Sequence, residues 1–207
     1  MPFEAIILAG GKSKRMGRDK ATLEIEGKAM IVHILDALKS AGCNNVLIQI
    51  KSPETQKILS PLVSDYDVIW GFDEGNESDI LQALYSALNT ALKHQWDFVQ
   101  LVPIDTPFLS SILFEKLTEL CKDDVEVVIP SSNSSKNTSS KGLEPLLSYV
   151  KVKPAIKKIS DARKYKDNRL VKIFCEMNHI IIEQPQWEKW GITEKSFKNL
   201  NYPKDCE

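Results

Sequence analysis

No stretch of the 207-residue sequence approaches the roughly 18 consecutive apolar residues that span a membrane. The N-terminus lacks the basic segment, apolar run and small-residue cleavage site of a secretory signal. Neither sign of charge dominates, because 27 Lys and Arg are balanced by 28 Asp and Glu. No overall field therefore favours nucleic acid or an anionic membrane as a partner. We expect a soluble, cytoplasmic protein that binds neither.

Three common functional motifs are also missing. The four cysteines form no CxxC pair, which excludes a zinc cluster or a redox motif, and we expect reduced thiols. A Walker phosphate loop ending at Gly11-Lys12-Ser13 would need glycine where Ile6 stands. The dinucleotide-binding GxGxxG is absent, since Gly10-Gly11 is followed by Gly17 at the wrong spacing. The P-loop is therefore excluded, and a Rossmann dehydrogenase is disfavoured.

Short apolar runs alternate with amphipathic segments along most of the chain. The runs fit strands buried on both faces, and the segments between them repeat apolar residues at helical spacing. This alternation predicts an α/β fold with a mostly parallel central sheet flanked by helices on both faces. We expect strands at residues 3–9, 45–50, 67–70, 97–103, 125–130, 143–150, 170–175 and 179–183. We expect helices at residues 29–41 (ended by Gly42), 53–63, 110–122 and 154–165, and one after an N-cap at Ser78.

Two polar segments interrupt this alternation. Residues 131–142 (SSNSSKNTSSKG) have no apolar surface to offset the entropy of ordering, so we expect a flexible loop there. The stretch from Lys151 to Lys172 is rich in Lys and Arg. A solvated helix face explains this stretch better than a site for an acidic ligand, although the charge pattern leaves both open.

The most informative segment is Leu8 to Lys20, LAGGKSKRMGRDK, at the end of the first expected strand. It has three glycines and five basic residues in thirteen positions. Glycines let a backbone approach a ligand with its N–H groups turned inward, and Lys and Arg supply charge for phosphates. A triphosphate is the ligand that fits, and a surface loop without a ligand is the alternative. Parallel sheets bind ligands beyond the carboxyl ends of their strands, which favours the triphosphate.

Asp105 follows another expected strand, at residues 97–103. Because the carboxyl ends of parallel strands meet at one edge, we expect Asp105 beside the glycine-rich loop. A carboxylate there is suited to Mg2+, which bridges phosphate oxygens, whereas an Asp-x-Pro sequence by itself is typical of a turn. The loop at the same edge favours the metal site.

With these residues the chain resembles the molybdenum cofactor guanylyltransferases, which make molybdopterin guanine dinucleotide. LAGGKSKRMGRDK matches their LAGGxSxRMGxDK motif at every specified position, and Asp105-Thr106-Pro107 matches their strand-end Asp-x-Pro. Residues 144–149 (EPLLSY) are similar to their His-Pro-Leu segment, and residues 197–205 (FKNLNYPKD) to their C-terminal motif. The resemblance spans almost the whole chain.

The resemblance implies a Rossmann-like nucleotidyltransferase fold and an enzyme that uses GTP and Mg2+ to transfer GMP to molybdopterin, with release of pyrophosphate. GTP and molybdopterin (the molybdenum cofactor) would be its partners, and transient contacts with other cofactor-biosynthesis proteins are left open. The residues that it places in catalysis are Arg15, Lys20 and Asp105, with Asp105 as the metal ligand. The residues that it places at the nucleotide are Leu8, Ala9, Gly10, Gly11, Lys20, Gln49, Asp73 and Asp105.

On the acceptor side the chain departs from the family pattern, because Glu144 replaces the usual His. Asn199 and Asn201 match the terminal motif and are either acceptor-pocket residues or turn residues. We expect one domain, with a nucleotide-binding half at residues 1–130 and an acceptor-side half at residues 143–207. The 131–142 loop would join the two halves.

Three other functions remain open at this stage. A sister enzyme, such as a molybdopterin cytidylyltransferase or a sugar-phosphate nucleotidyltransferase, would use the same scaffold, but Gly10-Gly11 and Asp19-Lys20 favour guanine by resemblance. A noncatalytic GTP-binding protein would keep the loop and release no pyrophosphate. A nucleic-acid binder is disfavoured by the balanced charge. The missing Ser/His/Asp arrangement is no objection to transfer between phosphates, which needs positioning and charge neutralisation rather than a protein nucleophile.

Overall fold

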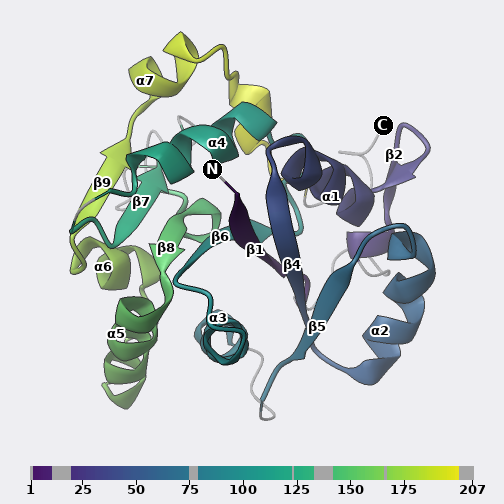
Figure 1. The fold of residues 1–207 in the computed structure, drawn as a ribbon, viewed down its shortest axis with the longest axis horizontal. Helices are drawn as coiled ribbons and strands as arrows, with labels where there is room; N and C mark the ends of the chain where they lie inside the picture. The colour runs from purple at the N-terminus through teal and green to yellow at the C-terminus, as the bar shows by residue number, and fades with distance from the viewer. Residues whose placement is uncertain are drawn as a thin grey trace.

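The computed structural model describes residues 2–10, 20–74, 79–122, 124–132, 142–165 and 167–200. Its centre is a seven-stranded sheet in the order β5-β4-β1-β6-β8-β7-β9 (Figure 1). Only β8 runs antiparallel to its neighbours in this described sheet. The strands are β1 (Phe3–Leu8), β4 (Cys43–Ile50), β5 (Val68–Phe72), β6 (Phe98–Pro103), β7 (Val127–Pro130), β8 (Tyr149–Lys151) and β9 (His179–Ile182). The predicted α/β fold with a mostly parallel sheet is confirmed.

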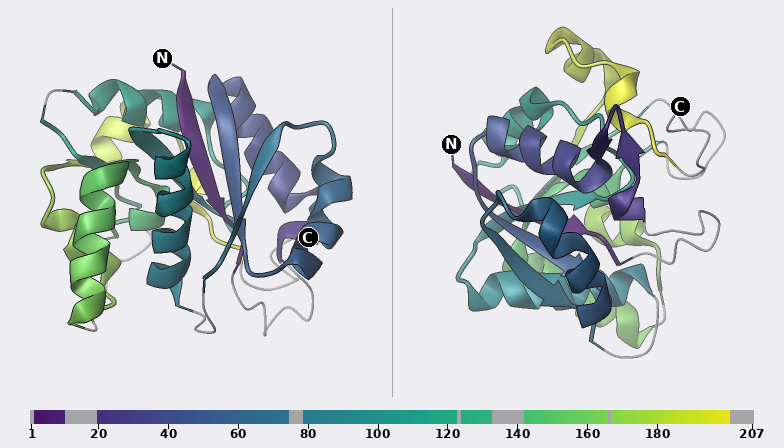
Figure 2. Two further views of the ribbon diagram at one scale, coloured as in Figure 1. Left: turned by 60° about the horizontal axis from the view of Figure 1, so that its bottom comes forward. Right: turned by 90° about the vertical axis from the view of Figure 1, so that its right-hand side faces the viewer.

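Helices cover both faces of the sheet, as predicted (Figures 1 and 2). One face packs against α1 (Met30–Ser40), α2 (Pro53–Leu59), α4 (Ser111–Leu120) and α7 (Gln184–Lys189). The other face packs against α3 (Ile80–Lys93), α5 (Val152–Lys164) and α6 (Leu170–Cys175). Two separate apolar clusters therefore form, one on each side of the sheet.

The central strand β1 shows why its sequence is apolar apart from Glu4 near its start. Phe3, Ala5 and Ile7 point into the cluster beneath α1 and α4, whereas Ile6 and Leu8 point into the cluster beneath α3. All five are at most 6% exposed. Successive side chains of a strand alternate between faces, so most positions of a strand covered on both sides are apolar.

Two helix boundaries follow their sequence signals. α1 ends at Ser40, and Gly42 has the predicted left-handed conformation, with φ of +82°. α2 begins at Pro53 after Ser52, whose hydroxyl oxygen accepts a hydrogen bond from the Thr55 amide at 3.5 Å.

The expected strand at residues 170–175 is wrong, because the structure has the helix α6 there. Its β-branched residues Val171 and Ile173 suggested a strand. However, the buried side chains are Leu170, Ile173 and Phe174, which share one helical face at spacings of three and four residues. Burial of this face against the sheet outweighs the intrinsic preference.

Two further expectations need correction. Residues 143–150 do not form one strand, because a 3-10 helix at Pro145–Leu147 precedes the short strand β8. Proline has no N–H for a strand ladder, so it suits the first position of a helical turn. The N-cap of α3 is Asp79 rather than Ser78: the Asp79 carboxylate accepts a hydrogen bond from the Leu81 amide at 3.2 Å.

Several short elements were not predicted. A two-stranded hairpin joins β2 (Glu24–Ile25) to β3 (Lys28–Ala29) through Glu26 and Gly27, which both have positive φ. This conformation matches the tight turns that connect antiparallel strands. A 3-10 helix at Lys20–Thr22 precedes the hairpin, and another at Glu194–Phe197 follows α7.

The expected flexible loop at 131–142 lies largely outside the described residues. Its two ends are paired, since Ser131 bridges to Leu143 and the Ser132 amide donates to the Gly142 carbonyl at 2.8 Å. The division into nucleotide-binding and acceptor-side halves stays a prediction. None of the described helices combines the length and apolar character that a membrane span requires.

We predict that Leu101→Ala on β6 lowers the free energy of unfolding by about 2–5 kcal/mol, because Leu101 is 0% exposed and a cavity would remain. Urea denaturation measures this loss. Ile112→Ala on α4 is the control: its side chain is 40% exposed, and we expect a change within about 0.5 kcal/mol. Equal losses in the two variants would contradict the central placement of β6.

Candidate active site

Four parallel strands end at one edge of the sheet, and main-chain hydrogen bonds fix their ends. The Ala9 amide donates to the Gln49 carbonyl at 2.9 Å, and the Ile104 amide donates to the Leu8 carbonyl at 3.3 Å. The Asp73 amide donates to the Ile50 carbonyl, also at 2.9 Å. The connections after β1, β4, β5 and β6 therefore leave from the same edge (Figure 2).

The structure brings together Lys20 and Asp105, which are 85 residues apart in the sequence. Lys20 opens a 3-10 helix and Asp105 lies two residues after β6. The Lys20 Nζ lies 3.2 Å from the Asp105 Oδ2, and the two side chains are 18% and 27% exposed. A cation and a carboxylate, both within reach of solvent, thus meet beyond the carboxyl ends of β1 and β6.

Two other predicted site residues, Gln49 and Asp73, bond to each other at the ends of β4 and β5. Gln49, in β4, is 0% exposed, and its Nε2 donates to the Asp73 Oδ1 at 2.9 Å. Asp73 follows β5 and is half-buried. Burial raises the pKa of the Asp73 carboxyl, while the hydrogen bond from Gln49 and the charge of Lys51 lower it.

The first part of the glycine-rich loop lies against this second pair. Leu8 ends β1, with Ala9 and Gly10 directly after it. A Cβ atom added at Gly10 would lie 2.9 Å from the Asp73 Oδ2, closer than real Cβ contacts allow. Glycine at position 10 therefore makes room for the carboxylate. The predicted site residues Gly11 and Arg15 lie outside the described residues.

Glu144, expected on the acceptor side, is a partly buried carboxyl. Its carboxylate accepts a hydrogen bond from the Ser132 hydroxyl. Burial raises the pKa of Glu144, the Ser132 hydrogen bond lowers it, and the negative charge of Asp105 raises it again. Glu144 thus shares the electrostatic environment of Asp105, which its place in the sequence did not indicate.

The C-terminal segment also reaches Asp105. The Leu200 amide donates to the Asp105 carbonyl at 2.9 Å, and Leu200 is 0% exposed. Asn199 precedes it and is exposed, whereas Asn201 lies outside the described residues. The predicted acceptor-side residue Asn199 therefore precedes the residue whose amide bonds to the Asp105 carbonyl.

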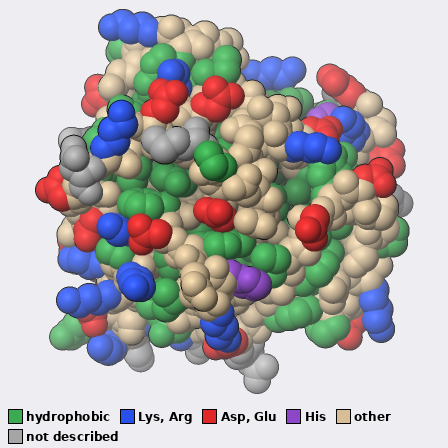
Figure 3. Space-filling model, viewed as in Figure 1, with side chains coloured by type: hydrophobic (Ala, Val, Ile, Leu, Met, Phe, Trp, Pro, Cys, Tyr) green, Lys and Arg blue, Asp and Glu red, His purple; other side chains and the backbone are tan. Residues whose placement is uncertain are grey.

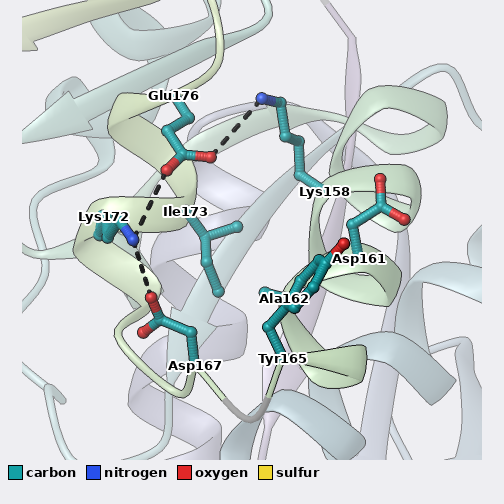
Figure 4. A pocket seen from close by; sticks show the side chains of 8 residues that line it. All are labelled: Lys158, Asp161, Ala162, Tyr165, Asp167, Lys172, Ile173 and Glu176. Atoms are coloured by element: carbon teal, nitrogen blue, oxygen red, sulfur yellow. Dashed lines mark hydrogen bonds and ion pairs between the residues drawn. The ribbon is translucent and has the colours of Figure 1, made fainter.

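The basic stretch 151–172 lies away from these pairs, on α5 and α6. Lys and Arg side chains gather over these helices at the lower left of Figure 3. A pocket of about 290 Å³ lies between the helices, and Figure 4 shows ion pairs along its α6 side and one from Lys158 of α5 to Glu176 at the end of α6. Lys172 lies 2.9 Å from Asp167 and 3.9 Å from Glu176, and Lys158 lies 3.7 Å from Glu176. Acidic partners among the cations support the solvated face over an acidic-ligand site.

Two of the described cysteines, Cys43 and Cys121, are poor nucleophiles. Burial raises the pKa of Cys43 and of Cys121 to about 12, so both are protonated thiols at neutral pH. Within the described part of the chain, no three His, Cys, Asp or Glu side chains gather into a metal cluster.

A family model described as MobA-like NTP transferase domain matches residues 5–178. The chain is 27% identical to the probable molybdenum cofactor guanylyltransferase of Bacillus cytotoxicus over 201 residues, covering 95% of this chain and 90% of the relative. It is 30% identical to the molybdenum cofactor guanylyltransferase of Shewanella piezotolerans over 148 residues, covering 70% of this chain and 68% of the relative. These matches agree with the resemblance found in the motifs.

Two solved structures share the fold. Molybdopterin-guanine dinucleotide biosynthesis protein A from Archaeoglobus fulgidus has a TM-score of 0.74 at 21% identity, covering 99% of this chain and 95% of that chain. The 4-diphosphocytidyl-2C-methyl-D-erythritol synthase of Anaerococcus prevotii has a TM-score of 0.72 at 15% identity, covering 99% and 92%. The predicted nucleotidyltransferase fold is confirmed.

We predict that Asp73→Asn is more stable than the wild type at neutral pH. The raised pKa means that the folded chain holds this proton more tightly than the unfolded chain, so the carboxyl destabilises most above its folded pKa. The advantage of Asn should shrink as pH falls through that pKa. Urea denaturation across this range measures the difference, and a less stable Asn variant at neutral pH would show that the site favours the charged carboxylate.

Proposed function

Because the chain belongs to the family of MobA-like NTP transferase domains, we propose that it transfers GMP from GTP to molybdopterin. The products would be the guanine dinucleotide cofactor and pyrophosphate. The observation that carries this proposal is the Lys20–Asp105 pair beyond β1 and β6, formed by two residues of the family motifs. The names of the curated relatives support guanine as the base and molybdopterin as the acceptor.

The reaction needs positioning and charge more than covalent chemistry. An oxygen of the acceptor phosphate attacks the α-phosphorus of GTP, the bond to the β-phosphate oxygen breaks, and pyrophosphate leaves with its electrons. This oxygen is already ionised, so no protein base has to remove a proton. Lys20 and Arg15 would neutralise the triphosphate, as electrostatic stabilisation of the transferring group requires.

Mg2+ fits the residues at this edge. Magnesium commonly binds one or two carboxylates together with substrate phosphates, and Asp105 supplies one partly exposed carboxylate at the edge where the triphosphate would lie. Asp105 would hold the ion, which when bound offsets the charge that develops on the phosphates. Lys20, which already lies beside the Asp105 Oδ2, would place its ammonium next to the same phosphates.

The acceptor side is built by the C-terminal half of the chain. Glu144 and Asn199, with Asn201, would line the space into which molybdopterin enters. The main-chain bond from Leu200 to Asp105 supports this arrangement, because it ties the segment that carries Asn199 to the metal ligand. Handover of the pterin by other cofactor-biosynthesis proteins would also take place on this side.

Nucleotide preference tests the proposal. We predict that GTP with Mg2+ stabilises the protein against denaturation by about 2.7 kcal/mol at 100 times its dissociation constant, because the ligand binds the folded state only. Thermal denaturation with GTP, CTP, ATP and UTP measures this effect. A preference for CTP would indicate a sister transferase. GTP binding without release of pyrophosphate in the presence of molybdopterin would indicate a noncatalytic protein.

Removal of the metal ligand tests the mechanism. We predict that Asp105→Ala lowers the transfer rate by about 100-fold or more, because an electrostatic contact to the transferring group is lost, while the free energy of unfolding changes by about 1 kcal/mol or less. Glu119→Ala is the control, since Glu119 also pairs with a lysine but lies in the last turn of α4, away from the site. Wild-type transfer by Asp105→Ala with Mg2+ would overturn this role.

A further inference from the structure

Gln49 is a fully buried amide at the end of β4, and its two polar atoms are in different situations. The Nε2 donates to the Asp73 Oδ1 at 2.9 Å. The Oε1 has no hydrogen-bond partner among the described residues. A buried amide usually satisfies both groups, since leaving one unpaired costs free energy. The orientation is nevertheless fixed, because a carboxylate only accepts hydrogen bonds and the NH2 group must face it.

Gly71 gives this amide its space. Gln49 and Gly71 are direct neighbours in the parallel register of β4 and β5. A Cβ atom added at Gly71 would lie 2.3 Å from the Gln49 Oε1 and 3.1 Å from Leu47. No side chain fits at position 71 while the amide keeps this position. The bare glycine and the long Gln side chain are therefore complementary.

The main chain around Asp73 is anchored on two sides. The Asp73 amide donates to the Ile50 carbonyl at 2.9 Å, and the next amide, of Glu74, donates to the Ser86 hydroxyl of α3 at 3.3 Å. With Oδ1 bonded to Gln49, the second oxygen, Oδ2, faces Gly10, the first glycine of the loop after β1. The carboxylate is thus set in one direction, toward that loop.

We infer that Gln49 is a positioning residue, which does not touch the nucleotide and instead holds Asp73 with its Oδ2 toward the nucleotide loop. This inference rests on the proposed function for the identity of the ligand. It differs from a direct nucleotide contact by Gln49, because a side chain that is 0% exposed has no surface to offer a ligand. Gly10 and Gly71 support this arrangement, because Gly10 leaves room for the Asp73 carboxylate and Gly71 leaves room for the Gln49 amide.

The chemistry of Asp73 limits what it binds. A carboxylate repels the phosphates and accepts hydrogen bonds from O–H and N–H groups. The guanosine part of GTP offers such donors, in the ribose hydroxyls and the base. Asp73 therefore serves the nucleoside, while the Lys20–Asp105 pair serves the triphosphate.

The pKa of Asp73 gives a readout that a change in packing alone would not alter. Burial raises its pKa, and the Gln49 hydrogen bond and the Lys51 charge lower it. Ser86, the α3 residue bonded to this segment, is neutral. Loss of the Gln49 donor should move the pKa of Asp73 further up, because a hydrogen bond to the charged form is removed.

The test compares two buried glutamines. In Gln49→Leu we expect the Asp73 carboxyl to titrate at higher pH in the ligand-free protein, as measured by carbon NMR. The dissociation constants of guanosine and GTP should rise about tenfold, the size expected for a lost hydrogen bond to a charged group, while that of inorganic tripolyphosphate stays unchanged. As pH falls, the loss of GTP affinity should begin at a higher pH than in the wild type.

Gln100→Leu is the matched control. Gln100, in β6, is also 0% exposed and also has an unpaired Oε1, but its Nε2 donates to main-chain carbonyls, at 2.8 Å to Leu101 and 2.9 Å to Leu147. The Gln100→Leu variant should be less stable than the wild type, while its Asp73 titrates as in the wild type. If Gln49→Leu does not fold, Gln49→Asn, whose amide is one methylene too short to reach Asp73, should show the same shift.

An unchanged Asp73 titration in both Gln49 variants would overturn the inference, as would equal losses of guanosine and tripolyphosphate binding. Failure of the proposed function looks different: the wild type would then bind no GTP, and the ligand-free titration would still decide whether Gln49 sets the state of Asp73.

Discussion

The site depends on the parallel register of β5, β4, β1 and β6, because it places four chain connections at one edge of the sheet. Both faces of these strands are covered by helices, so most of their side chains are apolar. Polar residues become usable only where the strands end. Asp73 and Asp105 lie just beyond such ends, where main-chain bonds from Asp73 to Ile50 and from Ile104 to Leu8 fix the chain, and Lys20 pairs with Asp105. The strands thus set the positions of the site residues, and the segments after the strands carry the charged side chains.

Much of this arrangement could be predicted from the sequence. The run of apolar residues at 3–8 predicts a strand buried on both faces, and the glycine-rich loop after it predicts a site at its carboxyl end. Asp105 follows from the same rule applied to β6. These predictions succeed because buried parallel strands have a simple pattern, and because their ends must meet at the same edge. The meeting of Lys20 and Asp105, 85 residues apart, confirms that reasoning.

Other features could not be predicted, because they depend on contacts between distant residues. The stretch 170–175 has β-branched residues, and only its packing against the sheet makes it the helix α6. Gln49 was expected to contact the nucleotide, and only its burial and its register opposite Gly71 show that it bonds to Asp73 instead. The effect of the Asp105 charge on the pKa of Glu144 and the bond from Leu200 to Asp105 link the C-terminal half to the site, and neither is visible in local sequence.

In the proposed complex, two groups of residues at one edge of the sheet bind GTP. Asp73 binds the nucleoside, and the Lys20–Asp105 pair binds the triphosphate. A crystal structure of the protein with GTP and Mg2+ tests this most directly. The account predicts the phosphates and the ion beside Lys20 and Asp105, and a guanosine donor on the Asp73 Oδ2. Nucleotide bound in the pocket between α5 and α6, or phosphates placed against Asp73, would contradict it.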